Sequence, residues 1–254
     1  MKETRFIGVI SGKGGVGKTT VVANIGAALS KEFKKDVVIV DCNLTTSHLS
    51  LSLGMYYCPL TINDVLRGDK HILEAMYDHP SGMKIVPASV QLTDLALLDV
   101  ARLENIVKNL EGKVDVVILD APPGLGREAY ATIRASDEII FVTNPNMPAA
   151  ADIIKCKEIV ESIKKKPIGV VLNMFNSRTY ELSRKEVEVL TELPVIATVP
   201  TDKNVAKSLA KRAPVVMHKP RASSSKELVK LAGRLIGEER EGFFSRFLRK
   251  FKKQ

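Results

Sequence analysis

The segment Ser11–Thr20 has the sequence SGKGGVGKTT and is the most informative part of this chain. It contains the phosphate-loop pattern G-x-x-x-x-G-K-[ST], with an apolar run before it and a helical run after it. Glycines let backbone N–H groups wrap around phosphate oxygens, and the helix N-terminus adds positive potential. We expect Lys18 to reach the β- and γ-phosphates of a nucleotide and the Thr19 hydroxyl to ligate Mg²⁺. The expected nucleotide contacts here are Gly12, Lys13, Gly14, Gly15, Val16, Gly17, Lys18, Thr19 and Thr20.

Apolar runs and amphipathic runs alternate along the 254 residues. The apolar runs are rich in Val and Ile and do not alternate with polar residues, which is typical of parallel strands buried on both faces. They lie at 6–10, 37–40, 83–87, 114–119, 138–143, 168–172 and 195–199. Helical runs lie at 18–31, 92–110, 149–165, 184–192, 205–211 and 223–236. This order predicts an α/β fold over residues 1–237, with a doubly wound, mostly parallel β-sheet flanked by helices.

Composition narrows the classes of protein further. Hydrophobic residues make up 45% of the chain, enough for a substantial core, yet no run approaches the roughly 18 apolar residues of a membrane-spanning helix. The N-terminus lacks the apolar core of a secretory signal, so we expect a cytoplasmic protein. Cys42, Cys58 and Cys156 form no C-x-x-C pair and are expected to be reduced thiols. Net charge is +9, and residues 242–254 alone contribute +5, which directs the charge argument to that segment.

A second lysine, Lys13, lies near the start of the loop, and KGGVGKTT resembles the deviant phosphate loop of the MinD/ParA ATPases. The resemblance implies an ATP-dependent homodimer in which Lys13 reaches across the interface to the partner's ATP. Charge supplied in this way stabilises the charge that develops on the transferred phosphoryl group, much as an arginine finger does. The alternative is a solvated loop lysine.

Two aspartates follow strand-like runs, where ligands bind in parallel sheets. Asp41 can hold Mg²⁺ directly or through water, and Asp120 resembles the family's Walker-B-like aspartate, so the expected metal set is Thr19, Asp41 and Asp120. The family pattern at the first position is usually D-x-D, but this chain has Asn43, which cannot accept a proton from water at neutral pH. We therefore expect a Mg²⁺-dependent ATPase that turns over slowly. The expected catalytic set is Lys13, Lys18, Asp41, Asn43 and Asp120.

Three further residues complete the expected nucleotide site. The Gly124 N–H, in the segment DAPPGLG, is expected to approach the γ-phosphate. Asn173 at a strand end, with Pro200 and Asp202 after another strand, resembles the family's adenine contacts. This pattern favours ATP over GTP, because no guanine-reading N-K-x-D follows an apolar strand. His48 departs from the asparagine commonly found there in MinD.

The C-terminal segment 238–254 is expected to be a linker and a basic amphipathic helix. At about 100° per residue, five apolar side chains fall within one arc of roughly 140°, and the basic residues occupy the other side. Such a helix suits an anionic membrane surface, and MinD proteins end in a comparable membrane-targeting helix. Docking on its own domain, nucleic-acid binding and a disordered tail are the alternatives. The expected membrane contacts are Phe243, Phe244, Phe247, Leu248, Phe251, Arg246, Arg249 and Lys250.

These features favour a MinD-like ATPase, peripheral on the cytoplasmic face of the membrane, that positions or recruits an unknown protein partner. One alternative is a ParA-like partition ATPase that binds DNA nonspecifically, with Lys211 and Arg212 as candidate contacts. An iron–sulfur carrier ATPase is disfavoured by the absent C-x-x-C, although a cluster bridged between two chains would need only single cysteines. Small-molecule kinases and synthetases also use phosphate loops, but they lack a lysine placed like Lys13.

Overall fold

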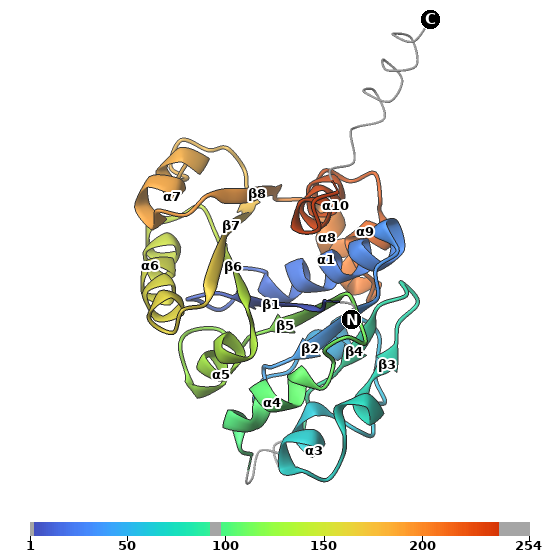
Figure 1. The fold of residues 1–254 in the computed structure, drawn as a ribbon. Helices are drawn as coiled ribbons and strands as arrows, with labels where there is room; N and C mark the ends of the chain where they lie inside the picture. The colour runs from blue at the N-terminus through green and yellow to red at the C-terminus, as the bar shows by residue number, and fades with distance from the viewer. Residues whose placement is uncertain (1–2, 92–97, 239–254) are drawn as a thin grey trace, which may run out of the picture.

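The computed structural model describes residues 3–91 and 98–238. An eight-stranded sheet with the order β3-β4-β2-β5-β1-β6-β7-β8 forms its centre (Figure 1). All neighbouring strands are parallel except β3 and β4, which pair antiparallel at one edge. The strands are β1 Arg5–Ile10, β2 Val37–Asp41, β3 Tyr77–Asp78, β4 Lys84–Val86, β5 Val116–Asp120, β6 Glu138–Thr143, β7 Lys166–Phe175 and β8 Val195–Pro200. The doubly wound parallel sheet expected from the sequence is confirmed.

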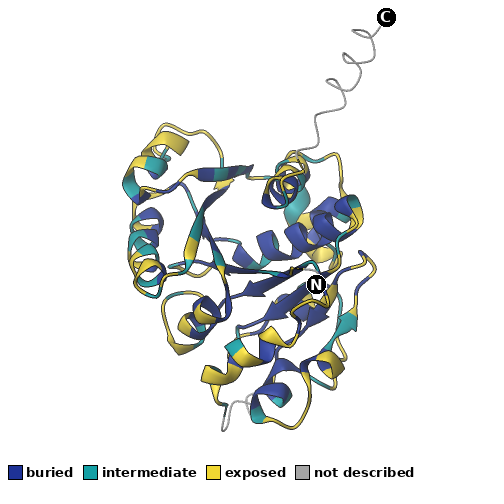
Figure 2. Cartoon of the chain, in the orientation of Figure 1, coloured by how far each residue is buried: buried dark blue, intermediate teal, exposed yellow. Residues whose placement is uncertain are grey.

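Helices cover both faces of this sheet because successive strand residues point to opposite sides. In β1, Ile7 and Val9 pack against the face covered by α1, α9 and α10, whereas Phe6 and Ile10 point to the other face. The helices of the first face are α1 Lys18–Phe33, α2 Leu49–Ser52, α8 Lys203–Ala210, α9 Val215–His218 and α10 Ser223–Leu235. Those of the second are α3 Ile62–Arg67, α4 Leu103–Lys108, α5 Arg127–Ala135, α6 Met147–Ser162 and α7 Arg184–Thr191. Figure 2 shows the result, with buried residues along the sheet and the inner sides of the helices.

The helix expected over 92–110 is wrong as one continuous element. α4 occupies only Leu103–Lys108 and follows a 3₁₀ turn at Val100–Arg102. The Asp99 side chain accepts a hydrogen bond from the Ala101 N–H and so caps this turn, which starts the helical segment late. Residues 92–97 lie outside the described part of the chain.

Several short elements were not predicted at all. α2, α3 and α9 have four to six residues each, too few to show a helical repeat. α5 has nine residues and begins straight after the glycine-rich segment that ends at Gly126, so turn residues mask its start. The antiparallel edge strand β3 has two residues.

The strand order predicts where a ligand binds: beside the carboxyl ends of the central strands. β1 lies between β5 and β6, so the chain winds away from β1 in both directions, and ligands bind beyond the carboxyl ends of strands at such a point. The phosphate loop follows β1 directly. In the register of the sheet, Asp41 at the end of β2 is paired with Asp120 at the end of β5. The segments that follow β1, β2 and β5 therefore meet at the carboxyl ends of these strands.

The last described residues lie at the opposite end of α1 from the phosphate loop. α10 packs on α1, and the Arg5 guanidinium at the start of β1 donates a hydrogen bond to the Leu235 carbonyl. Glu238 forms an ion pair of 2.8 Å with Lys35, just after α1 ends. α1 has 16 residues and is therefore about 24 Å long. The amphipathic helix expected beyond this point lies outside the described residues, among which no helix is both long and apolar enough to cross a bilayer.

Candidate functional site

The phosphate loop has a backbone that only glycine fits at two positions. Gly15 and Gly17 have φ angles of 79° and 87°, in the left-handed region. A Cβ on Gly17 would also lie 2.3 Å from Nδ2 of Asn173. That same Nδ2 donates a hydrogen bond of 2.8 Å to the Val16 carbonyl. Asn173 from β7 thus braces the loop in addition to any contact with a base.

The loop opens onto a cavity of about 430 Å³. Besides the loop residues from Lys13 to Thr20, its lining includes Asn43, Thr46 and His48 from the segment after β2, and Pro123 from the segment after β5. The structure therefore brings together the three segments that the sequence singled out separately. The volume is of the size typical of small-molecule sites.

Lys18 and Asp120 form a buried ion pair at the floor of this site. The Lys18 Nζ lies 2.5 Å from the Asp120 Oδ1, and the two side chains are 7% and 1% exposed. A lysine in this position can serve phosphate oxygens only if it leaves the carboxylate. The ion pair thus keeps the Lys18 ammonium inside the loop, and the Asp120 carboxylate at the end of β5 neutralises its charge.

Asp41 lies next to this pair but has no basic partner of its own in the described structure. Its carboxylate accepts hydrogen bonds from the Ser47 hydroxyl at 2.7 Å and from the Asn43 N–H at 3.0 Å. Burial, and then the neighbouring Asp120 carboxylate, raise the pKa of Asp41 to about 7. Two adjacent carboxylates with one lysine form a site that favours another cation.

Mg²⁺ fits this donor set. Carboxylate and hydroxyl oxygens are its preferred protein ligands, and it usually takes only one or two carboxylates together with substrate phosphates. The described residues contain no cluster of three or more His, Cys, Asp or Glu that would form an all-protein cage. Thr19, Asp41 and Asp120 are the residues that would hold the ion.

The segment after β2 is fixed by contacts that the sequence did not reveal. Asn43 uses its whole amide, donating to the Thr46 carbonyl at 2.7 Å and accepting from the Thr46 hydroxyl at 3.0 Å. The half-buried Glu128 of α5 accepts a hydrogen bond of 3.2 Å from the Leu44 N–H. Burial raises the pKa of Glu128. Ser47 and Glu128 therefore position this segment around Asp41, although no motif marks them.

Lys13 differs from Lys18 in both its exposure and its ion pairing. Its side chain is exposed, and it forms no ion pair within the described part of the chain. The Ser11 hydroxyl donates to the Lys13 carbonyl at 3.0 Å and holds the backbone in place while leaving the side chain at the mouth of the cavity. An unpaired ammonium in this position can reach a ligand outside its own loop.

Two other predicted nucleotide contacts, Gly124 and Asp202, form hydrogen bonds within the fold. The Gly124 N–H donates to the Ser11 carbonyl at 2.9 Å, so it must break that bond to approach a γ-phosphate. Asp202 caps α8 and accepts hydrogen bonds from Ser223 and Ser224 of α10. Burial raises the pKa of Asp202, but the hydrogen bonds outweigh it and bring the pKa to about 2. Its carboxylate holds two helices together, so an adenine contact by this residue would fall to its backbone. Pro200, at the end of β8, stays a predicted base contact.

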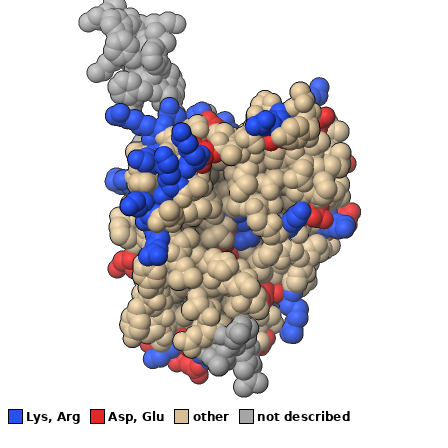
Figure 3. All heavy atoms as spheres, turned by 180° about the vertical axis from the view of Figure 1, so that it is seen from behind, with Lys and Arg blue, Asp and Glu red and all other residues tan. Residues whose placement is uncertain are grey.

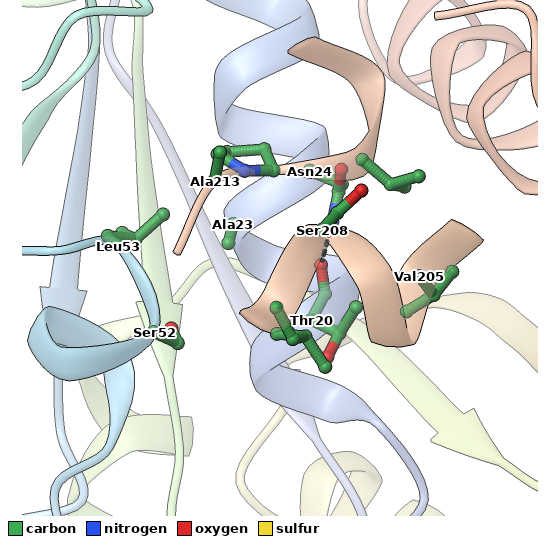
Figure 4. A pocket seen from close by; sticks show the side chains of 11 residues that line it. Thr20, Ala23, Asn24, Ser52, Leu53, Val205, Ser208 and Ala213 are labelled. Atoms are coloured by element: carbon green, nitrogen blue, oxygen red, sulfur yellow. Dashed lines mark hydrogen bonds between the residues drawn. The ribbon is translucent and has the colours of Figure 1, made fainter. Parts of the chain in front are cut away.

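A smaller pocket beside the phosphate-loop cavity links α1 to α8 and α9 (Figure 4). Asn24 of α1 lies at this junction, donates to the Thr20 carbonyl at 2.8 Å, and accepts from the Val216 N–H at 3.0 Å. Ser208 of α8 and Thr20 of α1 both line this pocket, as Figure 4 shows. The helix that starts at the phosphate loop is thus joined to α9 by the hydrogen bond between Asn24 and Val216.

Residues 7–215 match the family model described as the CobQ/CobB/MinD/ParA nucleotide-binding domain. The chain belongs to this family. The expected resemblance to the MinD/ParA ATPases is confirmed, and the match covers the phosphate loop, both aspartates and Asn173 within one family domain.

Relatives within the MinD/ParA family extend over nearly the whole chain. An uncharacterized ATP-binding protein of Methanocaldococcus jannaschii is 34% identical over 251 residues, covering 96% of this chain and 95% of that protein. The septum site-determining protein MinD of Pyrococcus horikoshii, solved in complex with Mg-ADP, has a TM-score of 0.88 and 31% identity, covering 91% of this chain and 96% of that one. MinD in the MinC:MinD cell division protein complex of Aquifex aeolicus has a TM-score of 0.82 and 25% identity, covering 94% and 97%.

Proposed function

We propose that this chain is a nucleotide switch of the MinD type, which pairs with a second copy when it binds Mg²⁺ and ATP and which recruits a protein partner to the membrane. The observation that carries the proposal is the contrast between Lys18 and Lys13 in one loop. Lys18 is buried and paired with Asp120, whereas Lys13 is exposed at the mouth of the cavity with no ion-pair partner in the described residues. A second copy facing the cavity would give Lys13 a ligand, the partner's triphosphate.

Mg²⁺ and ATP are the ligands of this site, and the MinD relative solved with Mg-ADP supports this choice. The loop N–H groups bind phosphate oxygens, and Lys18 moves from Asp120 to the β- and γ-phosphates. Thr19, Asp41 and Asp120 would hold Mg²⁺, which would neutralise charge on the phosphates. The partner's Lys13 supplies positive charge next to the transferred phosphoryl group. Such a charge raises the rate of phosphoryl transfer by about 10³-fold or more.

The rate of hydrolysis is proposed to be low. Asn43 orients the segment after β2 through both ends of its amide, and an amide cannot take a proton from the attacking water. Since phosphoryl transfer depends mainly on positioning and electrostatics, hydrolysis continues without a general base at this position. Slow turnover would leave the paired state long-lived.

The membrane step is assigned to residues 238–254, which we treat as a unit separate from the ATPase domain at 1–237. One such segment binds weakly, since folding a short helix offsets much of its gain. Two segments in an ATP-bound pair bind about 10² to 10⁴ times more tightly. A membrane-bound pair could then hold a partner at a cell-division or other surface site, and the MinC:MinD complex of Aquifex aeolicus supports a protein as that partner.

The test combines mass and lipid binding on the full chain. Light scattering after size exclusion should give a dimer with ATP and Mg²⁺ and a single chain with ADP and Mg²⁺. Co-sedimentation with phosphatidylglycerol-containing vesicles should follow the same nucleotide dependence. A chain that stays single at saturating ATP and Mg²⁺ overturns the proposal.

A matched pair of variants isolates the C-terminal segment. Phe247→Glu places a charge on the expected apolar arc and should abolish vesicle binding without changing dimer formation. Ser245→Glu adds the same charge to the polar side and should weaken binding far less. Equal loss in both variants would mean that overall charge, and not an amphipathic helix, controls binding.

The iron–sulfur alternative finds no support in the described residues. Cys42 and Cys156 are buried at 1% and 0% exposure, so neither thiol can reach a second chain. Only Cys58, which is partly exposed, lies near the surface. One accessible cysteine per chain does not supply the four thiolates that a bridged cluster takes from two chains.

A further inference from the structure

Positive charge gathers on one face of the folded domain, apart from the C-terminal segment. Residues 203–234 contain nine Lys and Arg and one Glu, whereas residues 1–202 contain 23 Lys and Arg and 25 Asp and Glu. The overall count conceals this asymmetry, so positive charge is concentrated in a second segment besides residues 242–254. Figure 3 shows a dense group of Lys and Arg side chains over the C-terminal helices, with only scattered ones elsewhere on that face. This basic face consists of Lys203, Lys207, Lys211, Arg212, Lys219, Arg221, Lys226, Lys230 and Arg234.

The helices arrange these residues as stripes. Lys203, Lys207 and Lys211 follow one another at four-residue spacing along α8 and its C-cap, which places them on one side of that helix. Lys226, Lys230 and Arg234 repeat the same spacing on α10. All six side chains are exposed. Asp202 binds Ser223 and Ser224, so the two stripes begin at the same point.

Most of this charge is not neutralised within the domain. Lys230 pairs with Glu227 at 2.6 Å, and Arg234 donates to the Ile196 carbonyl at 2.6 Å. Arg212 lies 4.6 Å from the centroid of the Tyr56 ring. The others form no ion pair with any described residue. Like charges at four-residue spacing destabilise a helix slightly, so folding of the domain does not explain the arrangement. An external polyanion does.

We infer that the basic face binds anionic lipid headgroups, so that the folded domain itself lies on the membrane beside the C-terminal segment. The inference rests on the proposed membrane function and adds a second contact to it. The α10 stripe runs toward Glu238, the last described residue, which is held against Lys35. Three residues then separate Glu238 from Gly242, a distance of at most about 14 Å for four extended residue steps.

That distance decides between a membrane and a nucleic acid as the polyanion. A membrane bound by residues 242–254 would lie close to the end of the α10 stripe, within a few times the Debye length of about 8 Å. Each basic residue near an anionic bilayer strengthens binding by about fivefold. The same bilayer can therefore engage both surfaces at once, whereas a nucleic acid would leave the apolar side chains of residues 242–254 without a ligand.

The test compares two full-length triple variants of equal net charge. Lys207→Gln, Lys211→Gln and Lys226→Gln remove three charges from the basic face. Lys113→Gln, Lys155→Gln and Lys185→Gln remove three exposed charges from elsewhere on the domain. None of the six lysines lines the phosphate-loop cavity, so ATP-dependent dimer formation serves as a check on folding. Binding is measured by co-sedimentation with phosphatidylglycerol-containing vesicles and, separately, by gel shift with duplex DNA.

The basic-face variant should lose vesicle affinity by at least about tenfold and the control variant by less than about threefold. Added salt should reduce the difference. Equal losses overturn the inference and leave the proposed function intact, because the C-terminal segment alone then explains binding. Unchanged vesicle binding with lost DNA binding also overturns it and assigns the face to nucleic acid. If the wild-type chain binds no vesicles with ATP, the proposed membrane function fails as well, and this result is visible without either variant.

Discussion

The phosphate loop and the basic face both concentrate positive charge, but they hold it in opposite ways. In the phosphate loop, Lys18 is buried and its ammonium lies 2.5 Å from Asp120. On the basic face, six exposed residues form two stripes that contain no acidic residue. A buried charge is costly unless it is paired, so the Lys18–Asp120 ion pair contributes to the stability of the folded site. The exposed lysines Lys203, Lys207, Lys211 and Lys226, by contrast, have no ion pair among the described residues and leave their charge available to another molecule.

Lys13 lies in the phosphate loop, but its charge is exposed like the charges of the basic face. It is exposed and has no ion pair in the described residues, although it lies within the same ten-residue segment as Lys18. This contrast within one loop leads to the largest expected effect. Of the four predictions that follow, three test charged residues of the phosphate-loop site, and the last tests the connection between that site and the basic face.

Lys13→Ala should lower ATP turnover by about 10³-fold while leaving the single chain stable and able to bind nucleotide. The unfolding free energy should change by less than about 0.5 kcal/mol, because an exposed and unpaired side chain is removed. Turnover is measured by phosphate release and stability by urea denaturation. A variant that still turns over at the wild-type rate would show that Lys13 is only a solvated loop residue.

Lys18→Ala should destabilise the fold by about 3–5 kcal/mol, because it leaves the buried Asp120 carboxylate without its partner. Nucleotide affinity, measured by calorimetry with Mg-ADP, should fall as well. The double variant Lys18→Ala with Asp120→Asn removes both charges and should recover most of the stability but none of the nucleotide binding. If the double variant is as unstable as the single one, the ion pair is not what connects Lys18 to stability.

Asp41 gives a pH dependence with a definite sign. Its pKa is raised from 3.8 to about 7, so between these values the folded state binds a proton that the unfolded state has released. Stability therefore falls as the pH rises through this window and levels off above it. Asp41→Asn should remove this fall and be more stable than the wild type at pH 8, without Mg²⁺, by on the order of 2–4 kcal/mol.

The measurement for Asp41 is urea denaturation between pH 5 and pH 8 at fixed salt. Mg²⁺ should stabilise the wild type at the upper end of this range and leave Asp41→Asn unaffected. Ser47→Ala is the matched control, since it removes a hydrogen bond to the carboxylate and keeps the charge. A wild-type curve that rises with pH would contradict the assignment.

Local patterns made the strands and the phosphate loop predictable. Runs of Val and Ile predicted β1 and β5 within two residues, and Asp41 and Asp120 follow strands, where ligand groups of parallel sheets lie. The predicted helix at 92–110 failed because Asp99 caps a 3₁₀ turn inside it. Ser47 carries no motif at all, and its role exists only because its segment folds back on Asp41.

Contacts between distant parts of the chain explain the other misses. Glu128 bonds to Leu44, 84 residues away, and such a pair cannot be found in one sequence by spacing. The hydrogen bonds from Ser223 and Ser224 to the Asp202 carboxylate could not be read from the sequence either, while the base contact expected of Asp202 stays a prediction. The basic face could have been counted in the sequence, yet only the packing of α9 against both α8 and α10 brings its residues onto one surface.

The smallest predicted effect concerns Asn24, which joins the two compared regions. Asn24 is 2% exposed, lies on the helix that begins at the phosphate loop, and accepts a hydrogen bond of 3.0 Å from the Val216 N–H. Asn24→Ala leaves this N–H in the first turn of α9 unsatisfied and should cost about 1–3 kcal/mol of unfolding free energy. Urea denaturation measures the cost, and hydrogen exchange at Val216 should speed up.

Asn105→Ala is the control for Asn24, because it makes the same substitution on the exposed side of α4 and should change stability by less than about 0.5 kcal/mol. If Asn24→Ala also lowers the ATP dependence of vesicle binding, the hydrogen bond transmits the nucleotide state from the phosphate loop to the basic face. If both variants are equally stable and both respond to ATP, the two regions share a helix but act independently. In that case charge at the phosphate loop and charge on the basic face serve separate ligands without energetic coupling through Asn24.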